Sequence, residues 1–196
     1  MKFLLSKGLI YNISNDKLLT IYHNGELIKL NRSESLIWNE CSWNPKNYKE
    51  LIEKNINSIE FSLGKLIEKN LIFISEKESI EDCLIDISLN CKFKLLNISI
   101  KDKLKSFNYK HIIKDIKFYN NLTSFDKMVY NYLKDYNNEI SVSDIILIID
   151  NGLFNINFFT DGYTQEYINI AKKSKSSKNV TQSIFKLLKS KLIYAT

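Results

Sequence analysis

The chain has 196 residues, 44% of them hydrophobic, with only one Pro and 5 Gly, a composition that can build a core in one or two domains and argues against disorder. Without seven tail lysines, 21 basic residues face 22 acidic ones, so the net charge of +6 belongs to the tail and not to the body. These lysines are Lys172, Lys173, Lys175, Lys178, Lys186, Lys189 and Lys191.

The first ten residues contain a short apolar run, Phe3-Leu4-Leu5, that Lys7 ends at once. A secretory signal needs about 7 to 15 apolar residues followed by a small-residue cleavage site. The sequence therefore predicts a cytoplasmic protein with no membrane span.

Three short segments then alternate between apolar and polar residues, at 9–13, 19–22 and 27–30. This period of two is typical of half-buried strands. Asn15-Asp16 and Asn24-Gly25 lie between the segments, and such residues tolerate the left-handed backbone of tight turns. We expect a three-stranded antiparallel sheet.

Three helices are expected next. Asn31 and Glu34 form a capping-box pattern at the start of the first helix. Asn44-Pro45 predicts the start of the second, because Pro at the first helical position loses no hydrogen bond. Asn57 begins another capping pattern for the third helix, and residues 71–74 would form a short strand, the wing.

This order of elements, with Leu30-Asn31 before Ile37-Trp38 and a step at Asn70-Leu71, resembles that of the PqqD-like proteins, the recognition elements of ribosomally made peptide natural products. The resemblance covers about residues 5 to 76. It departs after the first helix, where the family usually has Asp-Gly and this chain has Ser42-Trp43-Asn44-Pro45.

The resemblance implies that residues 1–76 form a peptide-binding winged-helix domain. Such modules hold the leader region of a precursor peptide as an extra strand along the third strand, in a groove closed by the third helix. A peptide-modifying enzyme is the implied partner, in a hetero-oligomer. Carried onto this chain, the site would comprise Glu26, Leu27, Ile28, Lys29, Leu30, Glu60, Gly64, Ile67 and Glu68.

Gly64 is unusual because a glycine within a helix costs up to about 1 kcal/mol relative to Ala. One explanation is room for a ligand, and the other is close packing against a strand. A winged helix also suggests DNA binding, but the third helix is neutral, with Glu60 and Glu68 against Lys65 and Lys69. Phosphate recognition requires a basic helix, so nucleic-acid binding is disfavoured.

The remainder is expected to contain an acidic linker at 77–92 and a small α/β accessory domain at 93–196, which makes the whole chain α+β. The basic tail would form an amphipathic helix, either docked with its lysines in solvent or bound to an acidic partner or nucleic acid. Strands are predicted at 93–100 and 145–149, helices at 101–107, from Ser124, at 163–171 and at 180–194, and either type at 112–119 and 154–159.

Residues 144–151 weakly resemble the strand end of ThiF-like proteins. That fold binds nucleotide phosphates through a glycine-rich loop, whereas Lys101-Asp102-Lys103 follows the first predicted strand here. The resemblance therefore implies a degenerate form that binds no ATP. Asn151-Gly152 is equally consistent with a plain hairpin turn.

No pattern for catalysis or metal binding is visible. Cys41, Cys83 and Cys91 match no zinc spacing, and His23 and His111 are isolated. No nucleophile elbow or P-loop occurs. We expect a non-catalytic accessory protein without cofactor or metal. Its alternatives are an obligatory subunit of a heteromeric peptide-modifying enzyme and a winged-helix nucleic-acid-binding protein.

Overall fold

The computed structural model describes residues 1–54, 58–96, 121–136, 140–151 and 165–196. The fold is mixed α+β, as predicted, and includes the N-terminal three-stranded sheet. The chain divides into two compact units, hereafter unit 1 and unit 2. Unit 1 comprises Met1–Lys92 with Tyr194–Thr196, and unit 2 comprises Phe93–Ile193.

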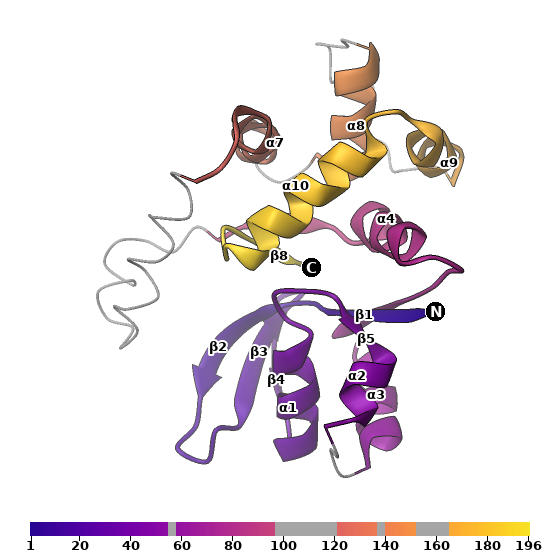
Figure 1. Cartoon of the computed structure of the whole chain (residues 1–196). Helices are drawn as coiled ribbons and strands as arrows, with labels where there is room; N and C mark the ends of the chain where they lie inside the picture. The colour runs from indigo at the N-terminus through magenta and orange to yellow at the C-terminus, as the bar shows by residue number, and fades with distance from the viewer. Residues whose placement is uncertain (55–57, 97–120, 137–139, 152–164) are drawn as a thin grey trace. The chain divides into compact units, whose positions relative to one another are not determined.

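The predicted sheet of unit 1 consists of β2 (Leu9–Ile13), β3 (Leu19–His23) and β4 (Glu26–Lys29), which follow one another as antiparallel neighbours (Figure 1). Asn24 and Gly25 turn the chain between the last two strands, with φ of 50° and 89°. Both residue types tolerate this left-handed backbone, so the hairpin forms where the sequence predicts it.

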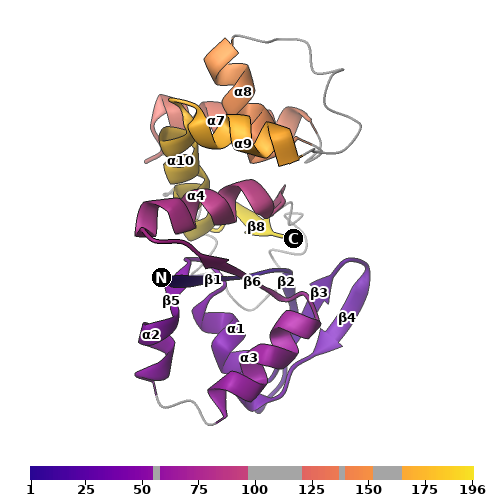
Figure 2. The ribbon, with the colours of Figure 1, turned by 90° about the vertical axis from the view of Figure 1, so that its right-hand side faces the viewer.

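A second sheet has the order β5-β1-β6, from β5 (Lys46–Asn47), β1 (Lys2–Ser6) and β6 (Ile72–Glu76). The predicted wing is present as β6, and it pairs antiparallel with β1 along its whole length (Figure 2). The sequence pattern did not indicate β1, because Phe3 through Ser6 are all buried and show no alternation.

Unit 1 also contains α1 (Arg32–Glu40), α2 (Tyr48–Ile52) and α3 (Ile59–Glu68). The capping box at the start of α1 is confirmed. The predicted start of the second helix at Pro45 is wrong: Lys46 pairs with β1, and Asn47 caps α2. Helix α3 begins after Ser58, and Asn57 lies outside the described residues.

One apolar core joins these helices to both sheets. Trp38 of α1 and Leu66 of α3 are almost fully buried in it. The core consists of Leu4, Leu19, Ile21, Leu30, Ile37, Trp38, Cys41, Leu51, Leu63, Leu66, Leu71 and Ile72.

The acidic segment that the sequence indicates as a linker or the start of an exposed helix contains a helix, α4 (Ile80–Asn90). Ser79 caps the helix by accepting from the amide of Asp82, and acidic residues in the first turn suit the positive end of the helix dipole. The Ser75 hydroxyl of β6 donates to Asp86 of α4 over 2.6 Å. Glu81, Asp82 and Asp86 of this segment therefore belong to a helix that packs on β6.

The described part of unit 2 is mainly helical. The buried strand predicted at 145–149 is wrong, because these residues belong to α8 (Val142–Asn151). All residues from Val142 to Ile148 are buried. A helix enclosed on nearly all sides has the same continuous apolar run as a buried strand, so the pattern does not distinguish the two. The overlooked signal was Ser141 with Asp144, whose side chains and amides bond reciprocally as a cap.

The other predictions for this half have mixed outcomes. A helix does begin at Ser124, and the helices predicted at 163–171 and 180–194 are confirmed over 165–171 and 180–189, whereas Ile193 and Tyr194 belong to a strand. The elements are β7 (Phe93–Leu95), α7 (Ser124–Asp135), α9 (Gln165–Lys173), α10 (Ser177–Lys189) and β8 (Ile193–Ala195). Predictions at 97–100, 101–107, 112–119 and 154–159 lie outside the described residues.

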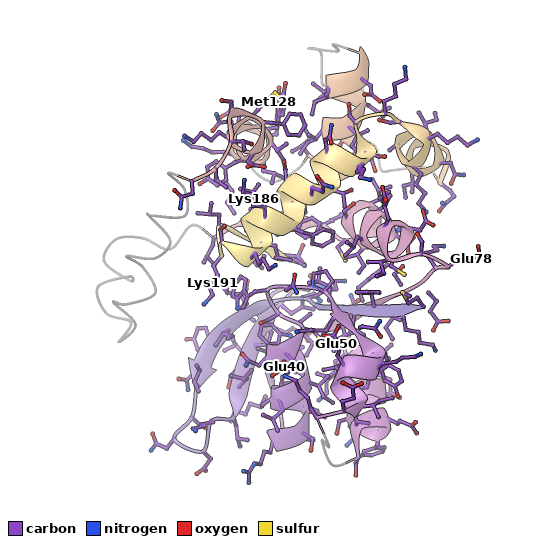
Figure 3. The ribbon with its side chains drawn as sticks, in the orientation of Figure 1. Glu40, Glu50, Glu78, Met128, Lys186 and Lys191 are labelled. Carbon is purple, nitrogen blue, oxygen red and sulfur yellow. The ribbon has the colours of Figure 1, made fainter. Side chains whose placement is uncertain are left out.

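Helix α10 is the predicted amphipathic tail helix, and it buries Val180, Ile184 and Leu188. Lys186, labelled on α10 in Figure 3, forms an ion pair with Asp126 of α7 at 2.5 Å. The Ser183 hydroxyl donates to the same carboxylate over 2.7 Å. One tail lysine therefore fastens two helices of unit 2. None of the described helices is both long and apolar enough to cross a membrane.

Candidate functional site

Strand β4 forms an open edge of its sheet. Its one neighbour within the described part of the chain is β3. The side chain of Leu27 is 53% exposed, whereas Ile28 is half-buried and packs against the core. The alternation therefore presents one apolar side chain on each face of an exposed strand edge.

The hydrogen bonds between β3 and β4 fix which backbone groups point outward. The amide of Leu30 donates to the carbonyl of Leu19 over 2.9 Å, which marks a hydrogen-bonded pair. Such pairs alternate along an antiparallel ladder, so Ile28 also bonds toward β3. The N–H and C=O groups of Leu27 and Lys29 consequently point away from β3, toward the open edge.

A row of apolar side chains crosses the sheet to reach this edge. Leu9 of β2 lies opposite Tyr22 of β3, and Tyr22 lies opposite Leu27 of β4. Tyr22 is 44% exposed, so the row lies on the face turned away from the core. A further strand beside β4 would extend this row by one side chain.

The helix α3 is fastened close to the end of β4. Its last turn places Lys69 3.2 Å from Glu34 of α1, and Glu34 accepts from the amide of Asn31 over 3.1 Å. Asn31 follows Leu30, the residue just after β4 and its neighbour Lys29. The side of α3 that carries Lys69 is therefore linked to the first turn of α1, the helix that follows β4.

Two other residues share that side of α3 by their spacing of four. Phe61 is 66% exposed, and the Lys65 ammonium lies 4.4 Å from the centre of its ring. Residues four apart are neighbours on a helix surface, so Phe61, Lys65 and Lys69 form one stripe. The prediction from the sequence did not include Phe61 and Lys65, although the 61-65-69 spacing was visible.

Three of the four predicted helix residues line a different hollow. Glu60, Gly64 and Ile67 face β1, β6 and Tyr48 of α2 around a volume of about 220 Å³. The hollow is lined by Lys2, Leu4, Tyr48, Glu60, Leu63, Gly64, Ile67 and Ile74. The structure therefore separates the predicted helix wall from the predicted strand edge, and Glu68 stays exposed between the two sides of α3.

Gly64 opens onto this hollow. A Cβ atom added to it would meet no heavy atom within 4 Å. Close packing against a strand is thus not the reason for this glycine. Room for a ligand, the other explanation, stays a prediction.

Burial shifts the pKa of His23, Cys41 and Cys91 in unit 1. Burial, the larger effect, and the charge of Lys7 both lower the pKa of His23, whose Nδ1 has no partner among the described residues. Burial raises the pKa of the Cys41 and Cys91 thiols to about 12. Within the described ranges, no three His, Cys, Asp or Glu side chains lie close enough to hold a metal ion.

Comparison with known proteins does not assign the chain to a family. The chain matches no protein-family model, no curated protein and no solved structure.

Proposed function

We propose that this chain is a non-catalytic, cytoplasmic accessory protein that binds the leader region of a ribosomally made precursor peptide by strand addition and presents it to a partner modifying enzyme. The observation that carries the proposal is the open edge of β4, where Leu27 and Lys29 direct their backbone groups outward. An extended peptide would satisfy these groups and extend the sheet.

The element order around the edge supports the same proposal. The sheet, the three helices and β6 follow one another as in the PqqD-like proteins that the sequence resembles, with Leu30-Asn31 joining β4 to α1. Helix α3 stands near the end of the edge through Lys69 and Glu34. The proposed wall of the groove is the Phe61–Lys65–Lys69 stripe instead of the residues predicted first.

A proline variant tests strand addition at one hydrogen bond. Leu27→Pro removes an N–H that points outward, so it leaves the bonds to β3 in place. Leu27→Ala is the matched control, because it removes the same side chain and keeps the N–H. Binding of fluorescein-labelled leader peptides, from small open reading frames beside the gene, is measured by fluorescence anisotropy with the full chain.

We expect Leu27→Pro to weaken binding about tenfold more than Leu27→Ala, a difference of about 1.4 kcal/mol, which is the size of one backbone hydrogen bond. Ile13→Pro, at the opposite edge of the same sheet, should bind like the wild type. Equal affinity of both Leu27 variants would contradict strand addition at β4.

The role beside a partner enzyme needs a separate measurement. An accessory protein should lower the KM of the enzyme for its precursor and leave kcat nearly unchanged, because it supplies binding alone. An enzyme that is inactive without the chain even on saturating precursor would instead identify an obligatory subunit. A salt-dependent gel shift with duplex DNA would favour the nucleic-acid alternative.

A further inference from the structure

Two cations, Lys29 and Arg32, lie at the end of the β4 edge, and a third, Lys65, lies on α3. Within the described residues, none of the three has a carboxylate at ion-pair distance, and the Lys65 ammonium lies 4.4 Å from the centre of the Phe61 ring. Lys69, the fourth cation here, is neutralised by Glu34. The strand end that leads into α1 therefore carries unbalanced positive charge.

The acidic groups near the edge are fewer and lie elsewhere. Glu26 stands at the opposite end of β4, beside the turn, and pairs with no cation in the part of the chain that the structure describes. Glu68 is exposed on α3, three residues from Lys65, and offsets one of the charges. The edge therefore carries a charge gradient, acidic at Glu26 and basic from Lys29 onward.

We infer that the peptide bound at β4 is acidic at the end that meets Lys29 and Arg32, and apolar where it passes Leu27 and Ile28. This inference rests on the proposed function and specifies its ligand. Opposite charges placed across neighbouring strands stabilise the pairing, and like charges destabilise it. The charge gradient therefore selects both the composition of the peptide and the direction in which it lies.

The apolar part of the pattern follows from the two faces of the sheet. A side chain opposite Leu27 would join the row formed with Tyr22 on the outer face. Its neighbour in sequence would point to the inner face, beside the half-buried Ile28. The ligand is therefore an extended segment with adjacent apolar residues at its centre and carboxylates toward one end.

Designed peptides test this without knowledge of the natural ligand. Two fluorescein-labelled probes share a centre of adjacent Val and Ile residues and carry either two Glu or two Lys at one end. Fluorescence anisotropy with the full chain gives their affinities. We expect the Glu probe to bind about tenfold more tightly, since each exposed pair contributes only a fraction of a kcal/mol to about 1 kcal/mol.

Charge reversal on the protein should invert this preference. The Lys29→Glu, Arg32→Glu double variant should bind the Lys probe more tightly, whereas Lys49→Glu, on the exposed face of α2, should keep the wild-type order. Raising the salt from about 0.1 M to 1 M shortens the Debye length from roughly 10 Å to 3 Å and should shrink the preference.

The outcomes separate this inference from the proposed function. Equal binding of both probes, with Leu27→Pro weakening each, would overturn the charge inference and leave strand addition intact. A Glu preference that survives Leu27→Pro but disappears in the double variant would support the charge inference and contradict strand addition. Failure of both probes to bind, or the same preference in wild type and double variant, would overturn the inference.

Discussion

The indole N–H of Trp38 donates a hydrogen bond to the backbone carbonyl of Lys7, 3.0 Å away. The Ser6 hydroxyl in turn donates to the carbonyl of Trp38 over 2.7 Å. These bonds fasten the segment between β1 and β2 to α1. Trp38, one of the residues that carry the family resemblance, is 1% exposed. It therefore packs in the core and does not lie on a surface that a ligand could contact.

Trp38→Phe should therefore destabilise unit 1. The variant leaves a cavity and an unpaired carbonyl at Lys7, for an expected loss of about 2–3 kcal/mol in the free energy of unfolding. Urea denaturation followed by circular dichroism measures the loss. Tyr11→Phe, at a side chain that is 68% exposed, should change stability little and serves as the control. A Trp38 variant as stable as the wild type would show that the bond to Lys7 contributes nothing.

Two glycine variants should change the free energy of unfolding in opposite directions. Gly64→Ala adds a Cβ in open space within a helix and should raise the free energy of unfolding by about 0.5–1 kcal/mol. Gly8→Ala should lower it, because its φ is +98° and the new Cβ would lie 2.6 Å from Ile21 Cγ2. Thermal melts of both variants check the pair. Destabilisation by Gly64→Ala would mean that the space beside α3 is occupied in solution.

The depressed pKa of His23 predicts a pH dependence of stability. Burial lowers the pKa of the folded state below the ordinary value of 6.5, so the unfolded chain binds the proton first. The contribution of neutral His23 to stability is fully present above pH 6.5, and it should be lost as the pH drops through 6.5 toward the folded-state pKa. His23→Gln should flatten this part of the curve in urea titrations from about pH 7.5 to 5. An unchanged slope would place its origin elsewhere.

The Asp126 carboxylate should make the stability of unit 2 depend on pH in the acidic range. Burial raises the pKa of its carboxyl, but bonds from Lys186, Ser183 and Thr123 outweigh burial and lower it to about 2 from 3.8. Its contribution, about 2 kcal/mol by linkage, is present above pH 3.8 and is lost as the pH falls toward 2. The wild type should therefore lose more stability than Asp126→Asn over this range. Parallel acid titrations of the two proteins would contradict the ion pair.

The buried thiols should resist alkylation. Cys41 and Cys91, with pKa values near 12, carry almost no thiolate at neutral pH. Iodoacetamide followed by peptide mass spectrometry should label neither residue in the native protein and both in urea. Rapid native labelling of Cys91 would show that its surroundings open easily.

Much of unit 1 could be predicted from the sequence because its strands β2 to β4 have one face in solvent. Alternation then distinguishes Ile21 from Tyr22, and Asn24-Gly25 marks the turn. β1 and α8 lack this contrast, since burial on all sides removes the periodicity from both. The strand that carries Glu26 to Lys29 could be located because its alternation and the Asn24-Gly25 turn are local features of the sequence.

The helix side of the site depends on contacts that are distant in sequence. The contact of α3 with the first turn of α1 is made by Lys69 and Glu34, which are 35 residues apart. Spacing alone identifies the stripes of a helix but not the neighbour that each stripe meets. Glu60, Gly64 and Ile67, which the prediction selected, line a hollow beside β1 and β6, and the proposed groove wall uses Phe61 and Lys65 instead.

Residues 195 and 196 form two backbone hydrogen bonds with the N-terminal part of unit 1. The amide of Gly8 donates to Ala195, and the amide of Thr196 donates to Lys92, each over 2.8 Å. During translation, residues 195 and 196 are made only after Phe93–Ile193. A nascent chain can therefore form β2 to β4 before these two hydrogen bonds exist. Ribosome-bound intermediates halted before residue 194 should be cleaved by protease near Gly8 sooner than the released protein.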